Sequence, residues 1–252
     1  MILRTRFKKD IVAEFLPPIK QKTSNKVVIF AGGMPSYPGR RRNLLEHWSK
    51  KGYWVFLPRY RGSWESEGKM FKTEPSQDLI DVIDSLKKGF KNSWSGEKYK
   101  IDNPEVYIIG SSFGGAAALL AASNKYVKKV VALTPVVDWR VESKAEPVLK
   151  LMDFIKQGFG AAYRFTPGGW SKIRSGRFFN PATALNLPGE KIMIIHTKDD
   201  QVVSIKPAEK LTEAIKAKMV IWSKGGHLSL SNLEQGGLSR RLKKVIDSFF
   251  KK

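Results

Sequence analysis

Residues 110–114 read Gly-Ser-Ser-Phe-Gly and carry the strongest chemical signal in the chain. They fit the pattern G-x-S-x-G, in which a serine occupies a sharp turn between a strand and a helix. The apolar run 106–109 and the small residues that begin at 115 supply that strand and that helix. The motif therefore predicts Ser112 as a nucleophile. The alternative without chemistry is a glycine-rich turn into a packed helix.

A serine hydroxyl is a weak nucleophile near neutral pH and needs a base, which is most often histidine. The chain has three histidines, His47, His196 and His227. His47 lies in a predicted helix beside a tryptophan and His196 ends a predicted strand, so both suit structural roles. His227 follows two glycines in a loop after the last predicted strand. The order serine, acid, histidine along the chain favours His227 as the general base.

The acid that orients the histidine is expected after a late strand, where the chain has the adjacent pair Asp199 and Asp200. Asp200 is followed by one variable residue and then two valines, a spacing that recurs in such loops, so it is the preferred acid. Asp199 is the first alternative, and Asp138, after an earlier strand, is a more remote one. An exposed Asp-Asp turn is the interpretation without catalysis.

Acyl transfer also needs amide donors aimed at the developing oxyanion. The amide of Phe113, directly after the predicted nucleophile, is one expected donor. The other is expected in the segment GGMP at 32–35, which follows a buried strand. Met34 is the preferred residue there and Gly33 the neighbouring alternative. Without this role the segment is a plain glycine turn.

The elements that must position these residues are read from hydrophobic periodicity. Strands are predicted at 2–7, 11–16, 26–31, 53–57, 106–109, 130–133, 192–195 and 219–222, and helices at 42–51, 77–90, 116–122 and 238–250. Alternation of this kind implies an α/β fold with a mostly parallel central sheet and helices on both faces. The candidate residues then lie in loops that follow strands.

Residues 140–180 break this alternation, because they offer helical stretches and a glycine-rich turn but no strand. We expect them to form a small helical cap, or lid, on a single domain that spans residues 1–252. The segment contains five aromatic residues, Phe154, Phe159, Tyr163, Phe165 and Trp170. These side chains are expected either to form an apolar pocket over the nucleophile or only to pack within the cap.

The composition excludes several kinds of catalytic site and limits the partners that the protein is expected to bind. Among 252 residues there is no cysteine, which excludes disulfides, a thiolate nucleophile and cysteine-based metal sites. No nucleotide-binding or paired-histidine motif is present either, so no cofactor and no metal are expected. The formal net charge of +22 is spread along the chain, which predicts weak nonspecific contact with nucleic acid and no specific complex. No bilayer-spanning run or secretory signal is found, and the cytoplasm is the expected location.

Six segments together carry a family resemblance: GGMP (32–35), PRYRGSWESEG (58–68), GSSFGG (110–115), TPVVDW (134–139), HTKDDQVV (196–203) and GGH (225–227). On these segments the chain resembles the α/β hydrolases, in particular the catalytic domains of prolyl-oligopeptidase-like (S9-type) enzymes and their esterase relatives. The resemblance implies an α/β-hydrolase fold and a Ser-His-Asp triad. The chain departs from the pattern of these enzymes in two segments. The segment 32–35 lacks the usual histidine before its glycines, and the acid loop has Thr197 where glycine is common and Ser204 where proline is common.

The expected function is hydrolysis of small-molecule carboxylic esters through an acyl-enzyme. The alternative within enzymes is an aminopeptidase, which would anchor the substrate's amino terminus on carboxylates, with Glu65, Glu67 and Glu142 as candidates. The excess of basic residues disfavours that alternative. A non-catalytic basic binding module is a third possibility, and it is disfavoured because every triad position is filled.

Overall fold

The computed structural model describes the chain except residues 20–23, 40–41, 144, 146, 232–237 and 252. Its centre is an eight-stranded sheet in the order β1-β2-β4-β3-β7-β8-β9-β10. The strands are β1 (Leu3–Phe7), β2 (Ile11–Leu16), β3 (Lys26–Ala31), β4 (Trp54–Pro58), β7 (Glu105–Ser111), β8 (Val127–Leu133), β9 (Ile192–Thr197) and β10 (Lys218–Trp222). The ladders β1–β2 and β2–β4 are antiparallel. All ladders from β4 to β10 are parallel, so the predicted sheet is confirmed.

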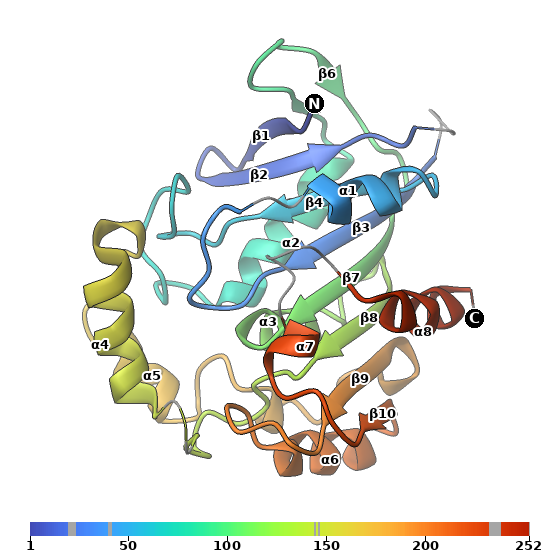
Figure 1. Ribbon diagram of the computed structural model, residues 1–252. Helices are drawn as coiled ribbons and strands as arrows, with labels where there is room; N and C mark the ends of the chain where they lie inside the picture. The colour runs from blue at the N-terminus through green and yellow to red at the C-terminus, as the bar shows by residue number, and fades with distance from the viewer. Residues whose placement is uncertain (20–23, 40–41, 144, 146, 232–237, 252) are drawn as a thin grey trace.

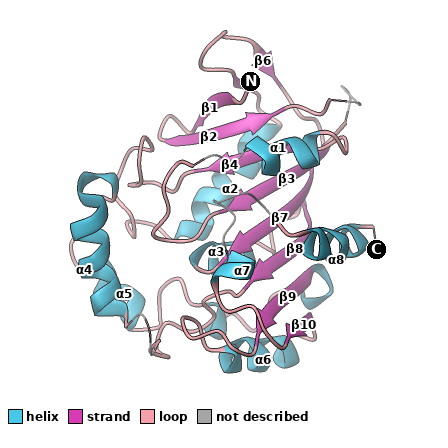
Figure 2. Ribbon diagram, in the orientation of Figure 1, coloured by secondary structure: helices cyan, strands magenta, loops and turns pink. Residues whose placement is uncertain are grey.

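Helices cover both faces of this sheet (Figure 2). One face packs against α1 (Arg42–Ser49) and α8 (Arg240–Phe250), and the other packs against α2 (Pro75–Leu86), α3 (Phe113–Leu120) and α6 (Ile205–Ala214). Successive side chains of a strand point to opposite faces. In β3, Val27 and Ile29 accordingly join one core while Val28 and Phe30 join the other. Burial on both faces explains why these strands read as continuous apolar runs.

The observed helix boundaries differ from those predicted by two to four residues at several ends, and two of these differences have a local physical reason. The helix expected at 77–90 ends at Leu86, because Gly89 turns the chain with φ +93° and Phe90 begins a small hairpin of β5 (Phe90–Lys91) and β6 (Lys98–Tyr99). The helix expected from residue 116 already begins at Phe113. The first turn of this helix contains Gly114 and Gly115. Because glycine is a weak helix former, the sequence pattern does not predict this turn.

The segment that holds α4 (Val148–Phe159) and α5 (Gly169–Arg174) adds no strand to the sheet. It lies beside the carboxyl ends of β3, β7 and β8 (Figure 1). Isolated β-bridges join it to the chain after β4, between Ser63 and Tyr163 and between Met70 and Phe165. Short 3₁₀ turns at Gly160–Ala162, Pro181–Thr183 and Gly189–Lys191 and the helix α7 (Leu228–Ser231) complete the described elements. Within the described part of the chain, no helix is both long and apolar enough to cross a bilayer.

Candidate active site

Ser112 occupies the turn between β7 and α3, at the centre of the sheet. Its backbone has φ 52° and ψ −116°, a conformation that costs free energy for any residue with a Cβ. The Ser112 amide donates a hydrogen bond to the carbonyl of Leu133 at 2.9 Å, which ties the turn to the end of β8. A strained serine held in this way is the geometry expected of a nucleophile on a strand-to-helix turn.

Gly114 allows α3 to begin directly against the end of β3. A Cβ at this position would lie 2.1 Å from the carbonyl oxygen of Ala31 and 2.4 Å from that of Gly32, both in backbone that cannot yield. Any larger residue would therefore push α3 away from the loop that follows β3. The close approach places Ser112 and the loop 32–36 together, and Met34, Ser112 and Phe113 line the same pocket.

Asp200 and His227 form a buried hydrogen-bonded pair. Oδ2 of Asp200 lies 2.8 Å from Nδ1 of His227, and only 1% of the Asp200 side chain is exposed. Oδ1 accepts hydrogen bonds from the amides of Val202 at 2.9 Å and Val203 at 2.8 Å. Burial disfavours the charged carboxylate, but the bond from His227 and the two amides outweigh it, so the pKa of Asp200 is lowered. With Nδ1 facing a carboxylate, Nε2 is the nitrogen suited to act as a base.

Asp199 has a different task from its neighbour. Its two carboxylate oxygens accept the amides of Gly225 at 3.0 Å and Gly226 at 2.8 Å. These amides lower the pKa of Asp199. Asp199 thus holds the loop that carries His227 and has no contact with the imidazole among the described hydrogen bonds. The sequence indicated Asp199 only as a second choice for the acid.

The more remote acid and the two remaining histidines have partners of their own. Asp138 is paired with Arg140, with Oδ2 at 2.8 Å from Nη2, and it also accepts from Asn180. His196 is fully buried, its Nδ1 lies 3.0 Å from the amide of Thr197, and burial lowers its pKa. His47 packs edge-on against its neighbouring tryptophan in α1. None of these three groups pairs with His227 in the hydrogen bonds that the structure describes.

Two backbone amides lie at the pocket that contains Ser112. The hydrogen bonds that the structure describes include none from the N–H groups of Met34 and Phe113. Phe113 is the first residue of α3, and the first N–H groups of a helix have no partner within the helix. Such amides suit a site that binds a negatively charged oxygen. Gly33 lies against Ser112, since a Cβ there would be 3.7 Å from that of Ser112.

The loop that follows β3 is fixed by two aromatic side chains that sequence reasoning did not assign to it. The hydroxyl of Tyr163 accepts the amide of Ser36 at 2.7 Å and donates to the carbonyl of Ser36 at 2.8 Å. Nε1 of Trp64 donates to the same carbonyl at 2.7 Å. Ser36 lies two residues after Met34, so the α4–α5 segment directly braces the loop that supplies the predicted oxyanion donor.

The pocket beside Ser112 is mainly apolar. Its apolar lining comprises Met34, Phe113, Val136, Val137, Trp139, Val141, Val148, Leu151, Val202, Val203 and Pro207. The α4 helix contributes Val148 and Leu151. The five aromatic residues expected to line such a pocket do not do so. Phe165 and Trp170 pack together with ring centroids 5.1 Å apart, and Phe154 is 58% exposed. None of the five lines this pocket, so the expected aromatic pocket over Ser112 is not found.

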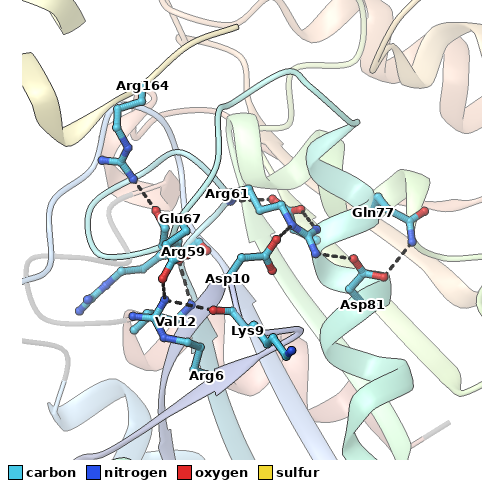
Figure 3. Close-up of polar contacts among 12 residues, drawn as sticks. Arg6, Lys9, Asp10, Val12, Arg59, Arg61, Glu67, Gln77, Asp81 and Arg164 are labelled. Carbon is cyan, nitrogen blue, oxygen red and sulfur yellow. Dashed lines mark hydrogen bonds and ion pairs between the residues drawn. The ribbon is translucent and has the colours of Figure 1, made fainter.

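The segment PRYRGSWESEG is anchored by arginines. Figure 3 shows Arg61 between Asp10 and Asp81, with N–O distances of 2.7 Å to each, and Arg61 also pairs with Asp78. Arg59 pairs with Glu14 and Glu65. These bonds join the β1–β2 turn, the chain after β4 and helix α2. They hold in place the segment whose Trp64 side chain donates a hydrogen bond to the loop that follows β3.

The three glutamates considered as anchors for a substrate's amino terminus do not line the pocket beside Ser112. Glu65 pairs with Arg59 and Arg4, and Glu67 pairs with Arg6. Glu142 is exposed. The described residues contain no group of three or more His, Cys, Asp or Glu side chains that could hold a metal ion. The geometry thus combines a serine on a strand-to-helix turn, a buried acid–histidine pair and an apolar pocket.

The sheet order and the serine on the β7–α3 turn define an α/β hydrolase. The family model described as serine aminopeptidase, S33, matches residues 22–175, which is more than half of the chain, and the chain belongs to this family of α/β hydrolases. The fold and the superfamily predicted from the sequence are confirmed. No curated protein sequence matches the chain.

Solved structures with the same fold include esterases and peptidases. An esterase of Pyrococcus furiosus superposes with a TM-score of 0.68 at 18% identity, covering 100% of this chain and 90% of that one. An acylaminoacyl peptidase of Pyrococcus horikoshii gives 0.65 at 18% identity, covering 100% of this chain and 41% of that one. Dipeptidyl peptidase 4 of Porphyromonas gingivalis superposes with a TM-score of 0.63 at 18% identity, covering 100% of this chain and 35% of that one. At these identities the similarity extends to the fold.

Proposed function

We propose that this α/β hydrolase is a carboxylesterase-like serine hydrolase with Ser112 as nucleophile, His227 as general base and Asp200 as the orienting acid. The observation that carries the proposal is the 2.8 Å contact between Oδ2 of Asp200 and Nδ1 of His227, with the carboxylate almost completely buried. A buried carboxylate fixes the tautomer of the imidazole and stabilises the imidazolium formed during attack. The strained turn at Ser112 supports the same assignment.

In the proposed mechanism, Nε2 of His227 takes the proton from Oγ of Ser112 as Oγ attacks the ester carbonyl. The amides of Met34 and Phe113 bind the developing oxyanion. The imidazolium then protonates the departing alcohol, and an acyl-enzyme remains. Water attacks the acyl-enzyme with His227 again as base, which releases the carboxylic acid and restores Ser112.

Ester rather than aminoacyl substrates are proposed because the described residues of the pocket include no free carboxylate that could serve as an anionic anchor. An exopeptidase has to hold the substrate's ammonium group near the reacting carbonyl. The one carboxylate of the described residues that lines the pocket, Asp138, is bound by Arg140 in two hydrogen bonds. Glu65 and Glu67, the other predicted anchors, are occupied by arginines. The apolar lining suits an acyl group instead.

We also propose that the α4–α5 segment is a cap on a single domain. Val148 and Leu151 of α4 line the pocket that contains Ser112. Tyr163, after α4, binds the backbone of the loop that follows β3. A segment that lines this pocket and binds the neighbouring loop can shield an acyl-enzyme from bulk water.

An aminopeptidase is the second candidate, and the description of the matching family favours it. The two candidates separate when kcat/KM for p-nitrophenyl butanoate is compared with kcat/KM for aminoacyl p-nitroanilides. We expect the ester to be the better substrate by about three orders of magnitude, because an alcohol leaves more readily than an amine and no anchor for the ammonium group exists among the described residues of the pocket. Equal or higher efficiency on the anilides would establish the aminopeptidase instead.

A further inference from the structure

A second hollow adjoins the pocket that contains Ser112. It has a volume of about 470 Å³ and shares Asp138, Val141, Ser204 and Pro207 with the first pocket. Its remaining lining comprises Arg140, Ala182, Leu185, Lys206, Lys210, Leu211 and Ala214. Because the two hollows share a wall, one molecule can place its reacting carbonyl at Ser112 and extend its other end into the second hollow. We call this second hollow the cationic pocket.

The charge of the cationic pocket is unbalanced. Arg140, Lys206 and Lys210 contribute three positive charges, and Asp138 contributes one negative charge that Arg140 already binds. The two lysines lie four residues apart on α6 and therefore share one face of the helix. Neither lysine forms an ion pair within the described residues. Among the described residues, two positive charges therefore have no ion-pair partner, and they line a hollow that also contains the apolar residues Val141, Leu185 and Leu211.

Arg140 is oriented by its neighbours, although its side chain is 56% exposed. Nε and Nη2 bind the two carboxylate oxygens of Asp138 at 2.9 and 2.8 Å. Its aliphatic stem passes over Gly176, where a Cβ would lie 2.6 Å from Cδ of Arg140, and φ of Gly176 is +67°. Asp138 lines both pockets, and its pairing with Arg140 leaves the two lysines of α6 as the cations of the second hollow that have no ion-pair partner among the described residues.

We propose that the cationic pocket binds a carboxylate at the far end of the substrate, so that the preferred esters carry an anionic group as well as the reacting ester bond. This inference rests on the proposed esterase function. Both lysines are exposed, so each ammonium is free to pair with a carboxylate, while apolar lining residues such as Leu185 and Leu211 suit the chain that connects this carboxylate to the reacting carbonyl. The carboxylate can belong to the acyl part or to the alcohol part of the ester, and the test has an arm for each.

The acyl arm compares mono-p-nitrophenyl adipate and suberate with their methyl-capped diesters, following p-nitrophenol release. The alcohol arm compares para-butanoyloxybenzoate with its methyl ester. For the wild-type enzyme, we expect kcat/KM for the anionic member of one arm to exceed that of its neutral partner by about tenfold, a typical gain from two charges near a protein surface. The arm that shows the gain identifies which part of the substrate carries the charge.

The variant arm uses Lys206→Gln/Lys210→Gln and Lys206→Glu/Lys210→Glu. We expect the first to abolish the preference for the anionic ester, and the second to reverse it to about tenfold in favour of the neutral ester. Activity on the neutral ester, expected to change by no more than about twofold, shows that both variants fold. The control Lys88→Glu/Lys91→Glu changes the net charge equally at exposed positions outside the pocket and should keep the wild-type preference.

Two other outcomes are distinguishable. If the neutral esters are hydrolysed but neither arm shows a preference for the anion, or if the control pair abolishes the preference as fully as the α6 pair, the cationic pocket is not the binding site. If no ester of either kind is hydrolysed, the esterase function itself is wrong. Loss of preference in the α6 variants alone, with neutral turnover intact, establishes the proposal.

Discussion

Asp199 and Asp200 are adjacent in the sequence, yet their carboxylates bind different parts of one loop. Asp200 contacts Nδ1 of His227 at 2.8 Å, while Asp199 accepts the amides of Gly225 and Gly226. One residue orients the imidazole, and the other fixes the turn from which the imidazole projects. The pair therefore positions the predicted base from two directions.

This division of roles predicts unequal effects of two matched substitutions. Asp200→Asn should lower kcat by about three orders of magnitude, because the imidazolium loses its charged partner and the tautomer is no longer fixed. Asp199→Asn should lower kcat by no more than about tenfold, because an amide oxygen still accepts one of the two glycine amides. Steady-state kinetics on p-nitrophenyl butanoate measures both. If Asp199→Asn were the more damaging variant, the acid would have to be reassigned to Asp199.

The bond between Tyr163 and Ser36 predicts an effect on catalysis from outside the triad. Tyr163→Phe removes both hydrogen bonds to the Ser36 backbone and loosens the loop that carries Met34. We expect kcat to fall by about tenfold with KM nearly unchanged, because an oxyanion donor acts mainly in the transition state. Tyr126→Phe, outside both pockets, serves as the control. A rise in KM with constant kcat would assign Tyr163 to substrate binding instead.

The arginine cluster predicts a large effect on stability. Arg61 binds Asp10, Asp78 and Asp81, and Asp78 is buried. Arg61→Met should lower the free energy of unfolding by about 3–5 kcal/mol, because it leaves a buried carboxylate without its counter-charge. Arg42→Met breaks an exposed pair with Glu46 and should leave the free energy of unfolding nearly unchanged, because surface ion pairs contribute little. Urea unfolding measures both variants. Equal losses of unfolding free energy would show that the Arg61 cluster contributes no more to stability than the exposed Arg42–Glu46 pair.

The lowered pKa values of Asp138, Asp199 and Asp200 predict a stability that depends on pH in acid. The unfolded chain binds these protons near pH 3.8, the ordinary value, and the folded protein only at lower pH. The contribution of these groups to the free energy of unfolding should therefore be fully present well above about pH 4 and be lost as pH drops below it. Between about pH 5 and pH 3, the free energy of unfolding of Asp200→Asn, measured with urea, should fall less steeply than that of the wild type. A slope equal to that of the wild type would contradict the lowered pKa of Asp200.

Much of this architecture follows from local sequence patterns. Strands such as Lys26–Ala31 are apolar on both faces, so their runs are visible without any tertiary information. Ser112, Asp200 and His227 each lie in a loop that follows a strand, and each loop has its own local motif. Periodicity and motif spacing are therefore sufficient to predict them.

Features that join distant segments could not be predicted in the same way. Tyr163 binds a backbone 127 positions away, and nothing around either residue encodes that partner. The wall of the cationic pocket combines Arg140 with two lysines of α6, and the lysines resemble ordinary solvated charges in the sequence. The sequence also allows the aromatic residues of the α4–α5 segment to lie over Ser112, whereas in the structure Trp170 packs against Phe71 and Phe165.

The most direct test of the central claim is labelling with a fluorophosphonate probe followed by peptide mapping. The probe reacts with a serine only when a base activates its hydroxyl. We predict a single adduct on Ser112, absent in Ser112→Ala and strongly reduced in His227→Ala, while His47→Ala is labelled as fast as the wild type. An adduct on Ser111 or on any other serine, or undiminished labelling of Ser112→Ala, would contradict the assignment of Ser112 as the nucleophile.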